Sequence, residues 1–469
     1  MASADDILNL ADYQSRKRPK HQGPARDQVE PVTEDWAAQV FLQRYSNTLL
    51  FCHDSGLWHD WSGSAWVPNK INAALHRVRE IARELSKDED EKIRATVGKA
   101  SFASGAERFC RADPAFAVTS EVWDSDPWLL GTPGGTVDLH TGEMRPADPA
   151  ERITKLTAVA PADTAECPLW LAFLGQATDS DAGLIRFLQQ WCGYCLTGVT
   201  REHALVFVYG PGGNGKSVFL NVLTGILAEY ARTAAMDTFT ASKGDRHPTD
   251  MAMLRAARLV TASETEEGHP WAEARIKSLT GGDPVTARFM RQDFFTYVPT
   301  FKLTVVGNHQ PALKNVDDAA RRRFNIVPFV HKPPAPDRQL EEKLKAEWPA
   351  ILRWMIEGCL DWQQNGLARP ASVTEATEAY FAEQDLMSQW LADRCLVRQG
   401  DPACWDTLAE LFASWKAYAA AAGEDPGTIK SFGPAMRRKG FRDKRTAAAK
   451  GLIGVRLLSE PQYPRNDRE

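Results

Sequence analysis

The sequence predicts an α/β protein built around a parallel sheet, and two observations lead to this fold class. Between residue 204 and about residue 330, short apolar runs alternate with helix-like segments, which is the pattern of a parallel sheet covered by helices. Within this region, the apolar run ALVFVY at 204–209 is followed by GPGGNGKS at 210–217 and by the helix-like VFLNVLTGIL. We therefore expect a strand, a glycine-rich loop and a helix in this order.

Composition predicts an ordinary soluble protein of several domains. The 469 residues are 43% hydrophobic and 25% charged, and their formal net charge is -5. No stretch approaches the roughly 18 apolar residues of a membrane span, and the N-terminus MASADDILNL lacks a basic-then-apolar signal pattern. We expect a cytoplasmic protein without membrane contact, in which any nucleic-acid surface is a local patch.

Composition shifts and periodicity divide the chain into six predicted parts. They are a disordered tail at 1–35, a mixed α/β N-terminal domain at 36–198, an α/β nucleotide-binding core at 199–335, a helical extension at 336–385, a small C-terminal domain of helices and strands at 386–460, and a tail at 461–469.

Two patterns in the N-terminal part have ordinary structural interpretations. Residues 41–66 carry three tryptophans spaced by turn residues and predict a small β-meander, in which the tryptophans are more often core than a base-stacking surface. Cys192 and Cys195 form a CxxC, but the motif lies inside the amphipathic run LIRFLQQWCGYCLTGV. We interpret these cysteines as small apolar helix residues rather than as a redox pair.

The glycine-rich loop has the residues that bind a nucleotide. Its glycines let successive backbone N–H groups point at the β-phosphate, Lys216 reaches the β- and γ-phosphates, and Ser217 offers a hydroxyl to Mg²⁺. The helix that starts here adds its positive end to the anion site. We therefore predict ATP and Mg²⁺ as cofactors. The predicted nucleotide-binding residues are Gly210, Pro211, Gly212, Gly213, Asn214, Gly215, Lys216, Ser217 and Val218.

Carboxylates follow a second apolar strand about forty residues downstream. The run ARLVTAS at 257–263 ends in Glu264, with Glu266 and Glu267 close behind. A carboxylate beside the phosphate loop can coordinate Mg²⁺ through water, and a second can orient the attacking water. Glu264 is the first choice for the metal, together with Ser217, and Glu266 is a second catalytic candidate. The sequence leaves open which of the three acids takes which role.

Two further features complete the predicted catalytic set. The strand FKLTVVG at 301–307 ends in Asn308, whose amide can sense the γ-phosphate and help hold the water. Three arginines then follow at 321–323, and they cannot all form salt bridges on one face. At least one, Arg322 or Arg323, is therefore predicted to meet a phosphate as an arginine finger delivered to a neighbour's site.

In this order, the motifs resemble one family. The phosphate loop, the strand ending in glutamate, KSLTGGD with TARFMRQDFF, the strand ending in GNH, and ARRRFNIVPF are together similar to superfamily-3 helicases of the phage and plasmid primase-helicase type, the group that includes the poxvirus replicative helicase-primase. Upstream, GGTVDLHTGEMRP and CPLWLAFL are similar to the domain that precedes the ATPase in that family. The resemblance implies an AAA+-like P-loop core assembled as a homo-hexamer, with Glu264 as the Walker B acid, Asn308 as sensor 1, and Arg322 or Arg323 as the finger.

The resemblance also implies a hairpin that grips single-stranded DNA in the central pore of the ring. The corresponding motif falls at 277–291. The residues themselves agree, because a Gly-Gly-Asp-Pro turn followed by alternating side chains predicts a hairpin. The predicted contacts of the single strand are Lys277, Arg288, Arg291 and Gln292.

A basic patch lies near the C-terminus. Residues 428–456 hold nine lysines or arginines and one acid, Asp443, although the formal charge of the protein is negative. Two helices and the apolar strand LIGVRLL fit a winged-helix-like module, which the family also places here, with its second helix in the major groove of duplex DNA. The predicted duplex contacts are Arg437, Arg438, Lys439, Arg442, Lys444 and Arg445.

The combined prediction is an ATP-dependent DNA helicase of phage, prophage or plasmid replication in a bacterial host cell, moving as a ring along single-stranded DNA. An ATP-controlled, origin-binding initiator with little unwinding activity is the alternative, and an ATPase of the same fold acting on protein is a third reading. The free finger and the cationic hairpin favour the translocase over both. The roughly 200 residues before the ATPase leave no room for the catalytic domain of members that also prime DNA, so we expect a helicase without a primase. A separate primase or polymerase is then a candidate partner.

Overall fold

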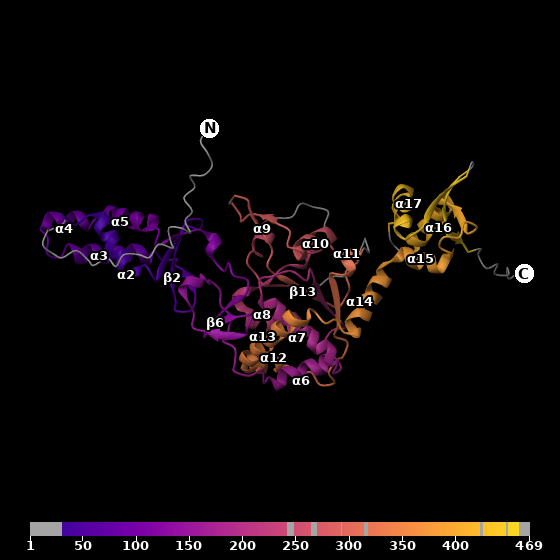
Figure 1. Ribbon diagram of the computed structural model, residues 1–469, viewed down its shortest axis with the longest axis horizontal. Helices are drawn as coiled ribbons and strands as arrows, with labels where there is room; N and C mark the ends of the chain where they lie inside the picture. Colours follow the sequence, from indigo (N-terminus) through magenta and orange to yellow (C-terminus); the bar gives the residue numbers. More distant parts are fainter. Residues whose placement is uncertain are drawn as a thin grey trace, which may run out of the picture. The chain divides into compact units, whose positions relative to one another are not determined.

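The computed structural model of the chain describes residues 31–241, 248–263, 270–291, 293–313, 318–422, 425–446 and 449–458 (Figure 1). These residues fall into two compact units. The first comprises the described part of Met1–Asp60 together with Pro68–Ser120, and the second comprises Trp61–Val67 and the described part of Glu121–Glu469. The predicted N-terminal domain, 36–198, differs from this division because its second half groups with the nucleotide-binding core.

The first unit combines helices with a small sheet. Its strand β1 (Leu49–Cys52) pairs with β2 (Leu57–Trp61) in the antiparallel sense and with β4 (Ala117–Val118) in the parallel sense. Phe41, Trp58 and Phe116 pack edge to face in the core, with ring centroids 5.5–5.8 Å apart. The helices are α2 (Glu34–Tyr45), α3 (Ala73–Leu85), α4 (Glu91–Val97) and α5 (Ala100–Ala112). The unit ends at Ser120, the first residue of the 3₁₀ turn η1 (Ser120–Val122).

The start of this unit differs from two sequence predictions. Helix α2 begins at Glu34, where the Thr33 side chain accepts the Trp36 N–H at 3.1 Å, so the last residues of the predicted tail 1–35 are helical. The first thirty residues of that tail lie outside the described residues. Phe41 belongs to α2 and not to a β-meander, because it is fully buried on the core face of this helix. The strands begin only after α2 has ended.

The centre of the second unit is a parallel sheet of five strands, as the sequence predicts. The strand order is β14-β8-β13-β10-β9, and every neighbouring pair is parallel. The bounds are β8 (Leu205–Tyr209), β9 (Ala231–Thr233), β10 (Leu259–Ser263), β13 (Lys302–Gly307) and β14 (Phe324–Pro328). Burial on both faces explains why these strands read as continuous apolar runs rather than as alternating ones.

Successive side chains of the sheet enter two different cores. In β8, Val206 and Val208 belong to a core shared with α6, α7, α8 and α13, whereas Leu205 and Phe207 belong to a core shared with α10 and α14. The sheet therefore lies between two layers of helices. Their bounds are α6 (Pro168–Ala177), α7 (Ala182–Leu196), α8 (Lys216–Leu227), α10 (Glu273–Gly281), α13 (Trp348–Asn365) and α14 (Ala371–Gln384).

The CxxC motif lies in the interior of α7, where this helix packs against α13. Cys192 and Cys195 are both fully buried and free. A Cβ on the glycine between them, Gly193, would lie 2.1 Å from the backbone nitrogen of Cys359 in α13. The motif is thus a close helix–helix contact, and burial raises the pKa of the Cys195 thiol to about 12. This agrees with the structural interpretation of the motif.

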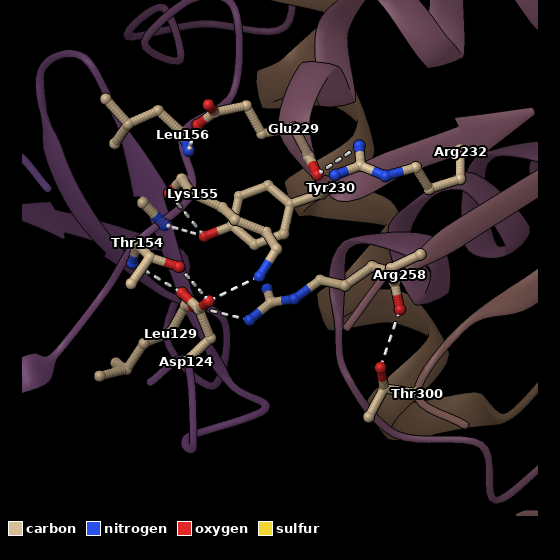
Figure 2. Close-up of polar contacts among 12 residues, drawn as sticks. Asp124, Leu129, Thr154, Lys155, Leu156, Glu229, Tyr230, Arg232, Arg258 and Thr300 are labelled. Carbon is tan, nitrogen blue, oxygen red and sulfur yellow. Dashed lines mark hydrogen bonds and ion pairs between the residues drawn. The ribbon is translucent and has the colours of Figure 1, made fainter. Parts of the chain in front are cut away.

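A three-stranded antiparallel sheet is fastened to the core through Tyr230 (Figure 2). The Tyr230 hydroxyl donates to the Lys155 carbonyl and accepts the Gly131 N–H, both at 3.0 Å, and its ring carries the Arg258 guanidinium at 4.5 Å. Lys155 in turn pairs with Asp124 at 2.6 Å. The strands of this sheet are β5 (Leu129–Thr132), β6 (Gly135–Asp138) and β7 (Glu143–Arg145). The second unit also includes the turn η2 (Pro149–Glu151) and Trp66 and Val67 of the strand β3 (Trp66–Pro68).

Two buried cations hold the C-terminal end of α7. Arg258, which precedes β10, donates to the Leu196 carbonyl at 2.5 Å and to the Leu129 carbonyl at 2.7 Å. Lys302, the first residue of β13, donates to the Thr197 carbonyl. Leu196 and Thr197 are the last residue and the cap of α7, where the helix dipole is negative. Burial lowers the pKa of Lys302 to about 7, so these acceptors offset only part of the lost hydration.

Several short elements surround the sheet. They are η3 (Ala228–Tyr230), η4 (Met236–Thr238), α9 (Pro248–Ala252), the hairpin of β11 (Val285–Ala287) and β12 (Phe295–Tyr297), α11 (Asp318–Arg321), α12 (Leu340–Leu344) and η5 (Lys345–Glu347). The last two of them, α12 and η5, lie in the predicted helical extension.

The C-terminal residues form a small core of their own, which includes Trp390, Trp415 and Phe432. Its sheet has the order β15-β19-β16-β18-β17. The elements are α15 (Leu386–Arg394), β15 (Cys395–Val397), β16 (Trp405–Thr407), α16 (Leu408–Ala421), α17 (Ile429–Arg438), β17 (Arg442–Arg445), β18 (Lys450–Ile453) and β19 (Val455–Leu457). Side chains of Thr407 and Thr428 cap α16 and α17.

None of the helices in the described ranges combines the length and the apolar content that crossing a membrane requires.

We expect Arg258→Ala to destabilise the second unit, because it leaves the Leu196 and Leu129 carbonyls without their donor. Hydrogen bonds to a charged group contribute about 1.5–3 kcal/mol each, so the loss of two should be roughly 3–6 kcal/mol. Thermal unfolding should show a midpoint lower by several degrees, and limited proteolysis should cut within 121–160 sooner than in the unmodified protein. Arg232→Ala is the matched control, because Arg232 is exposed on β9 and bonds only local carbonyls. Equal midpoints for the two variants would contradict the anchoring role.

Candidate functional site

The loop Gly210–Ser217 joins the carboxyl end of β8 to the start of α8 and is shaped by its glycines. Gly215 is the N-cap of α8 with a left-handed φ of 88°, and a Cβ there would lie 2.5 Å from the Phe173 ring. A Cβ on Gly210 would lie 1.9 Å from the Phe329 carbonyl oxygen. The chain can therefore follow this path only if these two positions carry no side chain. The first N–H groups of α8, which have no partner within the helix, lie at the loop.

Lys216 is folded onto the loop that it closes. Its side chain is only 7% exposed, and Nζ donates to the carbonyls of Gly210 at 2.6 Å and Pro211 at 3.2 Å and to Asn214 Oδ1 at 2.9 Å. Burial lowers the pKa of Lys216. Ser217, the next residue, is exposed at the first turn of α8. A cation, an exposed hydroxyl and a helix N-terminus thus lie at one loop, which suits a phosphate group.

Asn214 acts as a brace of the loop, a role that its place in the motif does not reveal. It is 3% exposed, and its Nδ2 donates to the Phe329 carbonyl while its Oδ1 accepts Lys216. The Phe329 N–H in turn donates to the Tyr209 carbonyl at 2.7 Å. The loop is therefore supported by the segment that leaves β14. No local sequence signal could have found this contact, because the partners are more than a hundred residues apart.

Asn308 lies at the same edge of the sheet as the loop. In the β8–β13 register, Gly307 pairs with Tyr209, so Asn308 follows β13 where the loop follows β8. Its side chain is exposed. Ser263 pairs with Val306 and ends β10 at this edge too. Glu264, Glu266 and Glu267, which follow Ser263 in the sequence, lie outside the described residues, so their predicted roles stay predictions.

Arg322 and Arg323 lie at the opposite edge of the sheet from the loop of their own chain. The Arg323 carbonyl accepts the Leu205 N–H at 2.8 Å, at the start of β8. The loop begins five residues further along β8, roughly 16 Å away at the rise of a strand. Arg323 is 9% exposed and donates to the Ala319 carbonyl at 2.8 Å, whereas Arg322 is exposed. Of the two, Arg322 has the side chain available to a neighbouring molecule.

The hairpin β11–β12 is present, and apolar side chains accompany its predicted cations. Arg288 is exposed and stacks on Phe294 at 4.7 Å, and Arg291 is also exposed. Phe294 and Met290 are themselves 59% and 72% exposed, and their exposure could not be predicted from the sequence, because apolar residues are more often buried. An exposed aromatic ring beside a cation suits the stacking of a nucleic-acid base.

Two of the predicted strand contacts fall elsewhere. Lys277 lies on α10 and is half-buried, so it does not belong to the hairpin. Gln292 is outside the described residues.

The predicted cations of the C-terminal domain divide into two groups. Lys439 is engaged within the domain, because its Nζ pairs with both carboxylate oxygens of Asp385, at 2.6 and 2.9 Å. Arg437 pairs with Asp443 at 2.8 Å, and Lys444 Nζ lies 4.3 Å from the Trp405 ring. The exposed cations for which the described residues offer no ion-pair partner are Arg438, Arg442 and Arg445.

Two families match parts of the chain. Residues 38–179 match the family described as D5 N terminal like, and residues 208–323 match a family of unknown function (DUF5906). The first match ends just after α6. The second runs from β8 through the phosphate loop to the last of the three arginines.

Three similar proteins come from viruses. The chain is 22% identical over 437 residues to "Putative helicase L207/L206" of Acanthamoeba polyphaga mimivirus, covering 81% of this chain and 45% of that protein. It is 26% identical over 318 residues to 022R of Frog virus 3, covering 63% and 31%. It is 25% identical over 325 residues to 184R of Invertebrate iridescent virus 6, covering 60% and 33%. The latter two are named as helicases in the same way, and the chain spans less than half the length of each relative.

A solved structure shares the fold. The apo C-terminal region of NrS-1 superposes with a TM-score of 0.51 at 11% identity, and the alignment covers 91% of this chain and all of that one. At this identity, the likeness concerns the fold alone. It extends beyond the parallel sheet to most of the chain.

Proposed function

Because the chain belongs to the D5-like family of phage and viral primase-helicases, we propose that it is an ATP-dependent DNA helicase of phage, prophage or plasmid replication. In this proposal it assembles as a homo-hexameric ring that moves along single-stranded DNA. The observation that carries the proposal is the separation of the phosphate loop from Arg322 across one sheet. A loop at one edge and an exposed cation at the other suit an ATPase whose sites are completed by the next subunit.

ATP fits the residues of the loop. Lys216 can exchange its loop carbonyls for β- and γ-phosphate oxygens, and the exposed Ser217 hydroxyl can hold Mg²⁺ together with Glu264, which the sequence predicts for that role. Bound Mg²⁺ supplies charge neutralisation on the phosphates. Asn308 follows β13 at the edge where the loop follows β8, and from this edge its amide would orient the γ-phosphate or the attacking water.

DNA fits two surfaces of the chain. The hairpin offers Arg288 and Arg291 together with exposed Phe294, a combination suited to single-stranded DNA. The order α15, β16, α16, α17 and the β17–β18 hairpin supports the proposal of a winged helix, in which α17 would enter the major groove. The exposed Arg438 and Arg442 would then face duplex phosphates.

An origin-binding initiator with little unwinding activity is the second candidate, and the exposed arginines around α17 favour it. The two candidates differ in strand separation. A forked DNA substrate tests this directly, because a helicase separates its strands only with hydrolysable ATP, whereas an initiator binds it without separating them.

We expect Lys216→Ala to reduce ATP hydrolysis by roughly 100-fold or more, because the buried cation of the loop is lost while its backbone remains. Strand separation on forked DNA should disappear with it. Steady-state phosphate release in Mg²⁺ measures the first effect and gel separation of labelled strands the second. Turnover equal to that of the unmodified protein would remove the nucleotide assignment.

Arg322→Ala should reduce hydrolysis by about 10³-fold without changing the thermal midpoint, because an exposed finger contributes to a neighbour's site. Arg323→Ala should lower the midpoint, because its side chain is buried and bonds Ala319. Mixing Arg322→Ala with Lys216→Ala protein should restore part of the activity, at interfaces that join an intact loop to an intact finger. Confirmed mixed assembly without any recovery would contradict a finger acting between subunits.

The double variant Arg438→Ala/Arg442→Ala should weaken duplex DNA binding about tenfold and leave DNA-independent hydrolysis unchanged. Each lost phosphate contact should reduce the slope of log K against log salt by about 0.9. Fluorescence anisotropy at several salt concentrations measures both quantities. Lys416→Ala, which removes one exposed cation from α16, is the control for the loss of a cation elsewhere in the domain, and it should change the slope by less than either single arginine variant. An unchanged slope in the double variant would make α17 a structural or protein-contacting helix.

A further inference from the structure

The segment that leaves β14, residues 329–332, is held against the phosphate loop. Phe329 is fully buried, its N–H donates to the Tyr209 carbonyl at 2.7 Å, and its carbonyl accepts Asn214. Its ring packs on Phe219 of α8 with centroids 5.7 Å apart. Phe329 is therefore fixed by β8, which precedes the loop, by Asn214 within the loop and by α8, which follows the loop.

Lys332 lies three residues further on and extends along the loop. A methyl group placed on Gly213 would lie 3.2 Å from Lys332 Cε, 3.9 Å from Cδ and 3.8 Å from Nζ. The whole end of the side chain thus lies over the middle of GPGGNGKS, while the residue stays exposed. Among the described residues, no carboxylate pairs with this ammonium group, although Lys343 and Lys345 on the following helices both have acidic partners.

Two lysines therefore lie at the same loop, and they differ in their exposure to solvent. Lys216 is buried and surrounded by carbonyl oxygens and an amide oxygen, whereas Lys332 faces solvent above Gly213. Two like charges at one loop repel each other, and an anion bound between them attracts both and offsets this repulsion. The loop N–H groups and Lys216 would bind the phosphates from inside the loop. Lys332 lies on the solvent side of the loop, from which it can reach the phosphate oxygens that face solvent.

We propose that Lys332 is a second phosphate-binding cation, supplied within the same chain, that distinguishes a nucleoside triphosphate from a diphosphate. This inference rests on the proposed ATPase function. Lys216 holds the β- and γ-phosphates from inside the loop, and Lys332 contacts the terminal phosphate from the solvent side. A diphosphate lacks that group, so its affinity depends much less on Lys332.

The test compares the full chain with Lys332→Ala, Lys332→Arg and the control Arg338→Ala, which removes an exposed cation six residues further on. Calorimetric titration with ATPγS and with ADP, both in Mg²⁺, gives the two dissociation constants. We expect Lys332→Ala to weaken ATPγS binding about tenfold and ADP binding less than twofold, because a charge-assisted contact to the terminal phosphate is lost. Lys332→Arg should restore most of the affinity, and Arg338→Ala should match the unmodified protein.

The outcomes separate this inference from the proposed function. If the unmodified protein neither binds nor hydrolyses ATP, the proposed function fails. If it hydrolyses ATP and Lys216→Ala does not, but Lys332→Ala binds ATPγS as tightly as the unmodified protein, only the role of Lys332 is overturned. Equal weakening of ATPγS and ADP would also overturn it, because the side chain would then support the loop rather than recognise the terminal phosphate.

Discussion

The common direction of the five strands is the constraint on which the candidate site depends. Because β8, β10 and β13 run parallel, their carboxyl ends share one edge, and the phosphate loop and Asn308 both begin there. The edge at which parallel strands end is also where ligands bind in open α/β sheets. The same constraint sends Arg323 to the other edge, since it precedes β14. The phosphate loop and the arginines that precede β14 thus lie at opposite edges of the sheet, and a ring of identical subunits would bring the loop of one subunit to the arginines of the next.

At the opposite edge of the sheet, buried side chains hold the strands to α7 and to the β5–β7 sheet. Arg258 and Lys302 stand at the start of β10 and β13, and both donate to carbonyls at the end of α7. Arg258 also reaches the β5–β7 sheet through the Leu129 carbonyl. Of the three strands that lead to the candidate site, β8 begins with the Leu205 N–H donating to the Arg323 carbonyl, whereas β10 and β13 are thus fixed at their amino ends by buried cations. A charge is costly there, and the helix dipole and the carbonyls keep it in place.

Charge near the C-terminus shows how tertiary contacts sort residues that look alike in sequence. Lys439 and Arg438 are neighbours in a basic run, yet Lys439 is held by Asp385 and Arg438 is exposed. The same sorting separates Arg323, which bonds Ala319, from the exposed Arg322. The residues available to a phosphate are those that intramolecular partners leave exposed. A count of cations identifies the region but not the contacts.

The sequence by itself determined the features that depend on neighbouring residues. Unbroken apolar runs predicted the parallel strands, and the glycine spacing before Lys216 predicted the loop between β8 and α8, because local backbone conformation follows local composition. The same reasoning misassigned Phe41 to a strand, because a short segment with aromatic residues fits either period. The roles of Glu264, Asn308 and the arginines stay predictions. Only the tertiary structure decided that Asn214 braces the loop on Phe329, that Lys332 lies over Gly213 and that Tyr230 fastens the β5–β7 sheet. Each of these joins segments far apart in the chain, and such pairs are set by sheet register and packing, which no local pattern encodes.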